Sequence, residues 1–294
     1  MDSNNLLNHH EPRELTFEIG GLFFAAQEWG EEGQLPVLAL HGWLDNSASF
    51  IALASKLTNI HLVAVDMAGH GQSSHRRGAA PYNIWEDVAE IFAIADQLGW
   101  QEFALLGHSR GGIIATIAAG TFPKRITNLA LIEGIMPEPT LAEDAPKQLA
   151  LSIKGVKTQT EKPLSIYADV ASAIAARERG MFPLSYGAAK VLTERGLKAV
   201  PRGFCWSTDQ RLLAPSAVKY IPEQMAAFIA QIKAPIKLIV ATDGMPKFFP
   251  LYATYLKKFP QIDLHIFPGT HHLHMEQGTD EVAVAFNELF AMRP

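Results

Sequence analysis

A serine between two glycines is the residue of this sequence that most directly suggests chemistry. It is Ser109, in the stretch 107–111 that reads Gly-His-Ser-Arg-Gly. The apolar runs 103–106 and 112–119 on either side predict a buried strand, a tight turn and a buried helix. Such a turn strains the backbone of the serine and lifts its hydroxyl clear of the sheet, while the glycines leave room. We therefore predict that Ser109 is a nucleophile; the alternative is a turn whose serine caps the helix.

A serine hydroxyl is a weak nucleophile and needs a base. Three histidines, His271, His272 and His274, follow the last predicted strand. We favour His271, because it comes first in the loop, directly after a Gly-Thr pair. His272 and His274 are close competitors, and the remaining alternative is that all three are ordinary surface or core histidines. A histidine cluster without a carboxylate pattern is weak as a metal site, so we predict no metal and no cofactor.

Two carboxylates compete to be the acid that holds the imidazole tautomer and stabilises the imidazolium. Glu133 follows the predicted strand 126–132, and Asp243 follows the predicted strand 236–240. Both positions lie at the strand ends where we expect Ser109, and either one gives the chain order serine, acid, histidine. Each is alternatively a loop carboxylate that caps a turn.

The backbone amides of Trp43 and Arg110 are the predicted donors to a developing oxyanion. Gly42 follows the predicted strand 37–40 and lets the backbone turn, so that the Trp43 amide points into the site. Arg110 follows Ser109 at the start of a helix, where the positive potential favours an anion. The Arg110 side chain either lines the pocket or pairs with a carboxylate.

Alternating strand-like and helix-like runs position these residues. The predicted strands are 15–19, 22–28, 37–40, 62–65, 103–106, 126–132, 236–240 and 263–267. The predicted helices between and after them are 47–57, 84–98, 112–119, 251–259 and 281–292. This alternation predicts a mostly parallel sheet with helices on both faces, which binds ligands beyond the carboxyl ends of its strands.

The alternation stops between residues 136 and 222. Helix-like patterns at 167–179 and 186–195 predict a mostly helical insertion that roofs the site. We therefore expect a core of residues 12–135 and 223–294, a helical cap of residues 136–222 and a polar tail of residues 1–11.

The cap is expected to set substrate specificity. Large apolar side chains that are candidates to line the pocket are Trp43, Met181, Phe182, Phe204, Trp206 and Phe248. The alternative is that the cap aromatics form a small core of the cap itself.

Composition excludes several classes of protein. The 294 residues carry a net charge of −5 without a basic block, which argues against nucleic-acid binding. No apolar run approaches the roughly 18 to 20 residues that cross a bilayer, and no signal peptide is evident, so we expect a cytoplasmic protein. The single cysteine, Cys205, excludes an internal disulfide. The glycine-rich stretch 66–74 lacks the spacing of a dinucleotide or P-loop fingerprint.

These motifs together resemble the α/β-hydrolase fold family, and among its members the serine hydrolase-like proteins. The segments that carry the resemblance are 41–46, 66–76, 107–112 and 269–276, in the family's order and spacing. The resemblance covers nearly the whole chain and is weakest over 136–222, where family members carry a lid. It implies a mostly parallel eight-stranded sheet with a helical cap inserted after the sixth strand.

The resemblance also bears on the acid. The family's usual acid follows the seventh strand, as Asp243 does, but Asp243 looks one residue out of register and is followed by Gly244. Haloalkane dehalogenases often place a glutamate after the sixth strand, and the segment 131–137 is similar to theirs, so we favour Glu133. Their nucleophile is an aspartate, whereas Ser109 argues for acyl chemistry.

We thus predict a serine hydrolase that cleaves small or medium, apolar carboxylic esters through an acyl-Ser109 intermediate. The alternatives are a carbon–carbon bond hydrolase or perhydrolase on the same three residues, and a ligand-binding protein without catalysis. The expected partner is a small-molecule ester; a homodimer stays open.

Overall fold

The computed structural model describes residues 11–249 and 251–292, so the predicted tail lies outside the described residues except for Glu11. Eight strands form one sheet in the order β1-β2-β4-β3-β5-β6-β9-β10. Their bounds are β1 Arg13–Ile19, β2 Leu22–Trp29, β3 Leu35–Leu40, β4 Ile60–Val65, β5 Phe103–His108, β6 Ile126–Ile132, β9 Ile236–Asp243 and β10 Ile262–Thr270. Strand β2 is antiparallel to both of its neighbours, and all other pairs are parallel.

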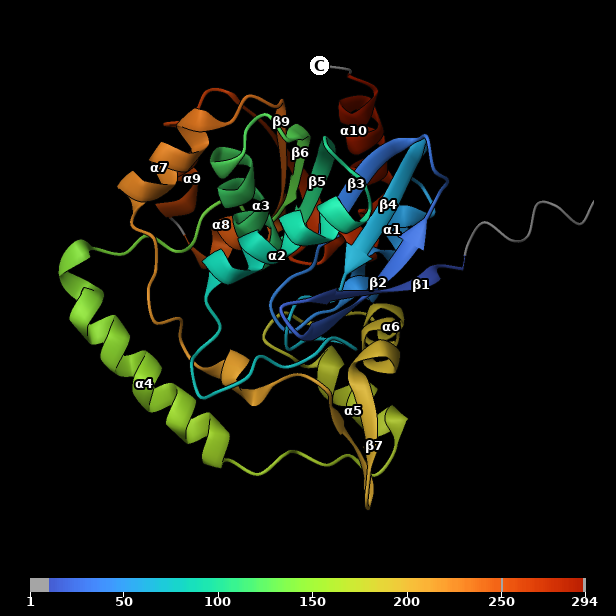
Figure 1. Cartoon of the computed structure of the whole chain (residues 1–294), viewed down its shortest axis with the longest axis vertical. Coiled ribbons are helices and arrows are strands. Elements are labelled where there is room, and N and C mark those ends of the chain that lie inside the picture. Colours follow the sequence, from blue (N-terminus) through green and yellow to red (C-terminus); the bar gives the residue numbers. More distant parts are fainter. Residues whose placement is uncertain (1–10, 250, 293–294) are drawn as a thin grey trace, which may run out of the picture.

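Helices cover both faces of this sheet. They are α1 Ile51–Ala54, α2 Ile84–Gln97, α3 Arg110–Thr121, α7 Pro222–Gln231, α8 Met245–Phe248, α9 Leu251–Leu256 and α10 Thr279–Ala291. In β3, Leu38 and Leu40 pack into one hydrophobic cluster with residues of α2 and α3, which lie in front of the strands in Figure 1. Val37 and Ala39 of the same strand pack into the opposite cluster with residues of α1 and α10. The central strands are apolar throughout because both faces are buried, which confirms the predicted fold class.

The chain between β6 and β9 forms no strand of the main sheet in the described structure. It contains helices α4 Ala145–Glu161, α5 Val170–Glu178 and α6 Tyr186–Gly196, followed by the hairpin β7 Leu197–Val200 and β8 Gly203–Trp206. In Figure 1, α5, α6 and β7 lie below the sheet, and α4 runs alone along the lower left. We refer to residues 136–222 as the cap segment.

The cap segment, predicted to be mostly helical, also contains a hairpin. The antiparallel hairpin of β7 and β8 turns through Pro201 and Arg202, and Arg202 has a φ of 80°. Each of its strands has only four residues, too few for the alternation of a strand to stand out in the sequence. Cys205, which lies in β8, is buried. The sequence patterns of this segment predict helices at 167–179 and 186–195, and none at the position of α4.

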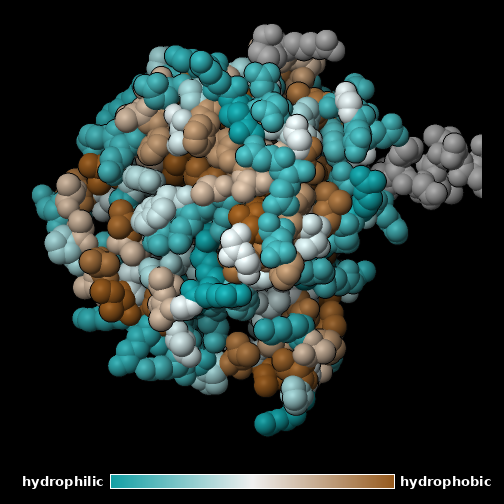
Figure 2. Space-filling model, viewed as in Figure 1, coloured by the Kyte–Doolittle hydropathy of each residue, from teal (hydrophilic) through white to brown (hydrophobic). Residues whose placement is uncertain are grey.

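Helix α4 keeps apolar side chains at the surface. Leu149, Leu151 and Ile153 are 47%, 47% and 63% exposed. Figure 2 shows brown, apolar atoms at the lower left, where α4 lies in Figure 1. Only Ser152 and Val156 of this helix are buried, so it packs through a narrow stripe. The many polar and charged residues of this helix lower its overall hydropathy, which explains why the sequence did not mark it as a helix that packs on the core.

Two predicted helices are shorter than expected. The helix expected at 47–57 is a 3₁₀ turn, Ser47–Phe50, followed by the four residues of α1. Asn46 begins the turn by accepting a hydrogen bond from the amide of Ala48, and Asn59, with a φ of 56°, redirects the chain into β4. The helix expected at 251–259 ends at Leu256 as α9.

Candidate active site

Ser109 lies in a sharp turn between β5 and α3. Its φ of 51° and ψ of −116° are strained for a residue with a side chain, at a cost on the order of 1–3 kcal/mol. Glycines make this turn possible: a Cβ at Gly111 would lie 2.0 Å from the carbonyl oxygen of Leu40, and one at Gly107 would lie 2.6 Å from Cα of Gly112. The strained turn between a buried strand and a buried helix is the geometry of a nucleophile elbow.

His271 follows β10 and bonds to Glu133, which follows β6. The two atoms joined are His271 Nδ1 and Glu133 Oε2, 2.9 Å apart, and both side chains are buried. A carboxylate only accepts, so Nδ1 carries the proton and Nε2 of His271 is left with its lone pair. The contact has the arrangement of a base and the acid that orients it.

Backbone amides hold the Glu133 carboxylate in place. The amide of Ala241 donates to Oε1 at 2.5 Å, and the amide of Met245 donates to Oε2 at 2.6 Å. Burial raises the pKa of Glu133 to about 7, although both amides act in the opposite direction. Burial also lowers the pKa of His271 well below its usual range, so the imidazole is neutral and able to accept a proton.

Asp243, the competing acid, lies elsewhere. Its side chain is 58% exposed and pairs with Lys247 at 2.8 Å. The adjacent Gly244 explains the departure noted in the sequence, because a Cβ there would lie 2.1 Å from Oε2 of Glu133. The glycine leaves the space that the Glu133 carboxylate fills.

The loops that carry Ser109, Glu133 and His271 touch one another. The amide of Ser109 donates to the carbonyl of Ile132 at 2.8 Å. Nε2 of His108 lies 3.0 Å from the carbonyl oxygen of His271. The neighbours of Ser109 therefore contact both other loops, and all three loops meet at the carboxyl edge of the parallel strands.

The two competing histidines make no hydrogen bond to Glu133 among the contacts of the described residues. Nε2 of His272 lies 3.2 Å from Oδ2 of Asp45, and His274 is buried beside Phe50. Asp45 and His272 are both buried, and Asp45 also accepts a bond from Arg177 of α5 at 2.5 Å. Sequence analysis singled out neither Asp45 nor Arg177. Asp45 belongs to the segment 41–46 that carried the resemblance, whereas no sequence signal marks Arg177.

The predicted oxyanion donors are placed as follows. Leu44 has a φ of 62° and turns the chain directly after Trp43. Within the described residues the Trp43 amide has no hydrogen-bond acceptor, and the Arg110 amide is in the first turn of α3, where helix amides lack intrahelical acceptors. The indole of Trp43 donates to the carbonyl of Leu212 in the cap segment at 2.8 Å. The Arg110 side chain pairs with Asp87 of α2 at 2.5 Å.

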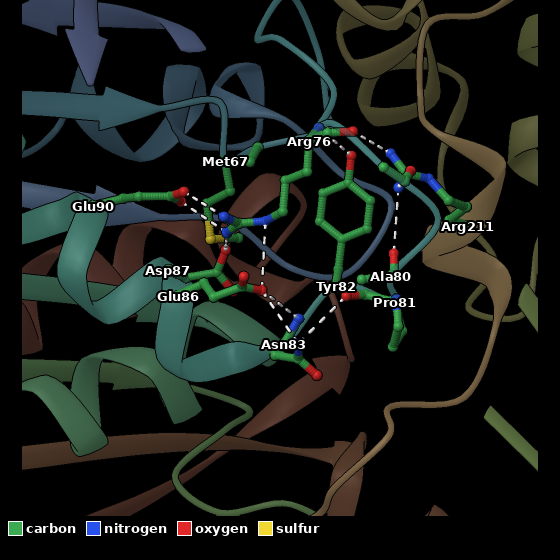
Figure 3. A network of polar contacts seen from close by, with 12 residues as sticks. Met67, Arg76, Ala80, Pro81, Tyr82, Asn83, Glu86, Asp87, Glu90 and Arg211 are labelled. Atoms are coloured by element: carbon green, nitrogen blue, oxygen red, sulfur yellow. Dashed lines mark hydrogen bonds and ion pairs between the residues drawn. The ribbon is translucent and has the colours of Figure 1, made fainter. Parts of the chain in front are cut away.

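Asp87, the ion-pair partner of Arg110, belongs to a larger ion-pair network next to the elbow. Figure 3 shows Arg76 between Asp87 and Glu90 of α2, with the guanidinium on Glu90 at 2.5 and 2.9 Å. Tyr82 donates to Asp209 at 2.8 Å, and Arg211 bonds to the same carboxylate at 2.6 Å. Asp209 and Arg211 belong to the cap segment, so the network joins the cap to the core.

The candidate substrate residues fall in three places. Phe182 stacks on His271, with ring centroids 4.0 Å apart and 24° between the planes, and meets Phe248 edge to face at 5.2 Å. Trp43 and the Arg110 side chain line a cavity of about 420 Å³. Trp206 lines a second cavity, of about 220 Å³, together with Leu44, Tyr167 and Arg177.

Phe182 and Phe248 line neither of these cavities, and two further candidates, Met181 and Phe204, lie neither in a cavity nor against His271. Met181 is 69% exposed, and Phe204 pairs through its backbone with Tyr167 inside the cap segment. Of the two cavities, only the one of about 420 Å³ is lined by a residue of the elbow, Arg110.

Comparisons with known proteins agree with this fold. Residues 36–162 match the family described as the alpha/beta hydrolase fold. A serine hydrolase-like protein of Danio rerio is 30% identical over 268 residues, which are 85% of this chain and 79% of the relative. A crystal structure of a hypothetical protein from Pseudomonas aeruginosa PAO1 is 39% identical, with a TM-score of 0.91 over 95% of this chain and 99% of that one. The thioesterase domain from the curacin biosynthetic pathway is 25% identical, with a TM-score of 0.79 over 96% and 99% of the two chains.

The fold and the elbow define an α/β hydrolase. Within that class, the chain belongs to the family of the serine hydrolase-like proteins. Among the described residues, no helix has the length and apolar character to span a membrane.

Proposed function

We propose that this protein is a serine hydrolase that cleaves carboxylic esters, with Ser109 as nucleophile, His271 as base and Glu133 as acid. The bond between His271 and Glu133, in a loop that contacts the neighbours of Ser109, carries the proposal. Membership of the serine hydrolase-like family supports hydrolysis as the reaction class.

In the proposed mechanism, Nε2 of His271 takes the proton of the Ser109 hydroxyl while its oxygen attacks the ester carbonyl carbon. The amides of Trp43 and Arg110 donate to the resulting oxyanion. His271 then gives the proton to the departing alkoxide, which leaves as the alcohol, and the acyl group stays on Ser109. Water, deprotonated by His271, hydrolyses this acyl-enzyme and restores the serine.

Glu133 acts through His271. Its carboxylate fixes the tautomer that leaves Nε2 free and stabilises the imidazolium that forms during proton transfer. Hydrogen bonds from two backbone amides fix the position of the carboxylate.

The cavity of about 420 Å³ supports a small or medium, mainly apolar acyl group. Its apolar lining includes Trp43, Ile113 and Tyr220, and Trp43 and Arg110, the residues of the proposed oxyanion amides, both belong to its lining. The cap segment supplies one wall of this cavity and covers His271 with Phe182, which favours its role as a lid.

The similarity to a thioesterase domain favours a thioester as the second candidate substrate class. Both substrates use the same acyl-serine chemistry and differ in the leaving group. Parallel assays on oxygen and sulfur esters of the same acyl chain separate them.

The decisive test compares wild type with Ser109→Ala on p-nitrophenyl esters of increasing chain length. We expect turnover to fall by about 10³-fold or more in the variant, because the nucleophile is gone while the fold remains. A fluorophosphonate probe should label wild type at Ser109 and leave the variant unlabelled. Unchanged turnover in the folded variant, or wild-type protein that is inert to both probe and esters, contradicts the proposal.

A further inference from the structure

Against the expectation from the sequence that no metal is bound, we propose that Asp45, His108 and His272 form a binding site for a divalent transition-metal ion, with the ligand chemistry of Zn²⁺, next to His271. One possible ligand atom from each residue lies within 4.8 Å of the other two. The three side chains are 1%, 0% and 3% exposed. Two imidazoles and one carboxylate are a donor set that suits zinc.

The spacing of the donor atoms fits a small ion. Oδ2 of Asp45 lies 3.2 Å from Nε2 of His272 and 3.5 Å from Nδ1 of His108. A tetrahedral ion with bonds of about 2.0–2.1 Å to nitrogen and oxygen holds its ligands about 3.3 Å apart. The two separations from Asp45 therefore match that of ligands on one ion, and the ligand atoms of the two histidines lie within 4.8 Å of each other.

The tautomer of His108 points to a cation. Its Nε2 faces the carbonyl oxygen of His271, which only accepts, so Nε2 carries the proton of the neutral ring. Nδ1 then turns a lone pair toward Oδ2 of Asp45 and, among the described residues, has no hydrogen-bond partner. Two lone pairs facing each other in a buried site repel, and a cation between them removes the repulsion. A second proton on His108 is the competing explanation, and it predicts no metal binding.

Two features of the surroundings agree with a bound ligand: space beside the donor atoms, and buried nitrogens without a hydrogen-bond partner among the described residues. A Cβ at Gly42 would lie 2.7 Å from Oδ2 of Asp45 and 2.8 Å from Nδ1 of His108, so the glycine keeps these two atoms uncovered. The neighbouring ring of His274, 4.3 Å from that of His108, is buried, and neither of its nitrogens has a partner within the described structure.

Arg177 uses the other oxygen of Asp45. Its guanidinium bonds to Oδ1 at 2.5 Å, which leaves Oδ2 for the ion and fixes the plane of the carboxylate. Its positive charge also opposes a cation at this site. Removal of that charge should therefore tighten metal binding, whereas a purely structural Asp45 network predicts no such gain.

The test uses the whole chain, stripped with a chelator, with His9 and His10 replaced by alanine to remove a competing pair. Titration with Zn²⁺ in a calorimeter should show one ion per chain, and Co²⁺ should give the visible absorption of a tetrahedral site. Asp45→Asn and His272→Gln should each weaken binding by about tenfold or more, because each removes or weakens a ligand. Arg177→Met should tighten binding by about tenfold. His265→Ala, a histidine outside the cluster, should leave it unchanged.

Folding is checked by circular dichroism, and the Arg177→Met gain keeps the test meaningful if a ligand variant fails to fold. The proposal is overturned if the folded wild type takes up no stoichiometric ion. It is also overturned if Arg177→Met and His272→Gln bind metal as wild type does. Because binding is measured without substrate, the outcome is independent of the proposed hydrolase activity.

Discussion

At the scale of single residues, the candidate site depends on glycines. Their importance is seen from the atoms that a Cβ at each position would contact. Gly244 makes space for the Glu133 carboxylate, and Gly42 leaves Asp45 and His108 uncovered. Gly42 and the glycines around Ser109 belong to motifs that the sequence itself marks, but the contacts that Gly42 and Gly244 leave open are not readable there. These contacts become clear once the neighbouring atoms are known, since most of those atoms belong to residues far away in the chain.

Replacement of each candidate acid by its amide gives a prediction at this scale. Glu133→Gln should lower kcat by about 10²–10⁴-fold, because an amide does not hold the tautomer or stabilise the imidazolium as the carboxylate does. Asp243→Asn, at an exposed ion pair, should retain kcat within about threefold. Steady-state kinetics on one p-nitrophenyl ester measures both. A large loss for Asp243→Asn with little loss for Glu133→Gln would reverse the assignment.

The choice between these acids shows how far the sequence reaches. The positions of the strands and of the elbow follow from local apolar patterns and glycine spacing. The contact between His271 and Glu133 joins residues 138 positions apart, and the sequence favours Glu133 only through the resemblance to haloalkane dehalogenases. Asp45 and its neighbours His108, Arg177 and His272 come from four separate segments, and no local pattern encodes such a meeting.

At the scale of elements, helix α2 carries a dense group of acids on the side that faces Arg76. Burial raises the pKa of Glu90 to about 7, and the nearby Asp87 adds to the effect although Arg76 opposes it. The folded protein thus binds this proton more tightly than the unfolded chain, whose glutamate has a pKa near 4.5. The stability that the protonated Glu90 contributes is fully present below pH 4.5 and is lost as the pH rises through about 7.

Glu90→Gln should therefore change the pH dependence of stability. Relative to wild type, the variant's free energy of unfolding should rise by about 1–3 kcal/mol between pH 5 and pH 8, whatever its offset at one pH. Urea denaturation at both pH values measures the difference, with the exposed Glu102→Gln as control. A constant offset between variant and wild type would show that the pKa of Glu90 is not raised.

At the scale of the whole molecule, buried ion pairs join the cap segment to the sheet. Nε of Arg195 on α6 bonds to both oxygens of Asp66 at 3.1 and 2.9 Å, and its other nitrogens reach Glu14 of β1. Arg195 is 5% exposed and Asp66 is fully buried. Such a contact is costly to break from one side, because the remaining charge stays buried.

Arg195→Met should lower the free energy of unfolding by about 3–5 kcal/mol, since Asp66 loses its cation. Lys190→Met on the same helix removes only an exposed pair with Glu194 and should cost less than about 1 kcal/mol. Chemical denaturation followed by tryptophan fluorescence compares the two. Equal, small effects would mean that this contact does not secure the cap segment.

Trp43 connects the cap segment to the proposed oxyanion site. Its ring is anchored to the cap segment at Leu212, while its peptide nitrogen belongs to the turn that would polarise the substrate. A bulky acyl group that pushes the roof outward would drag this nitrogen away from the reacting carbonyl. Under the proposed mechanism, discrimination by size would then act on kcat more than on KM, and oversized esters would bind yet turn over slowly.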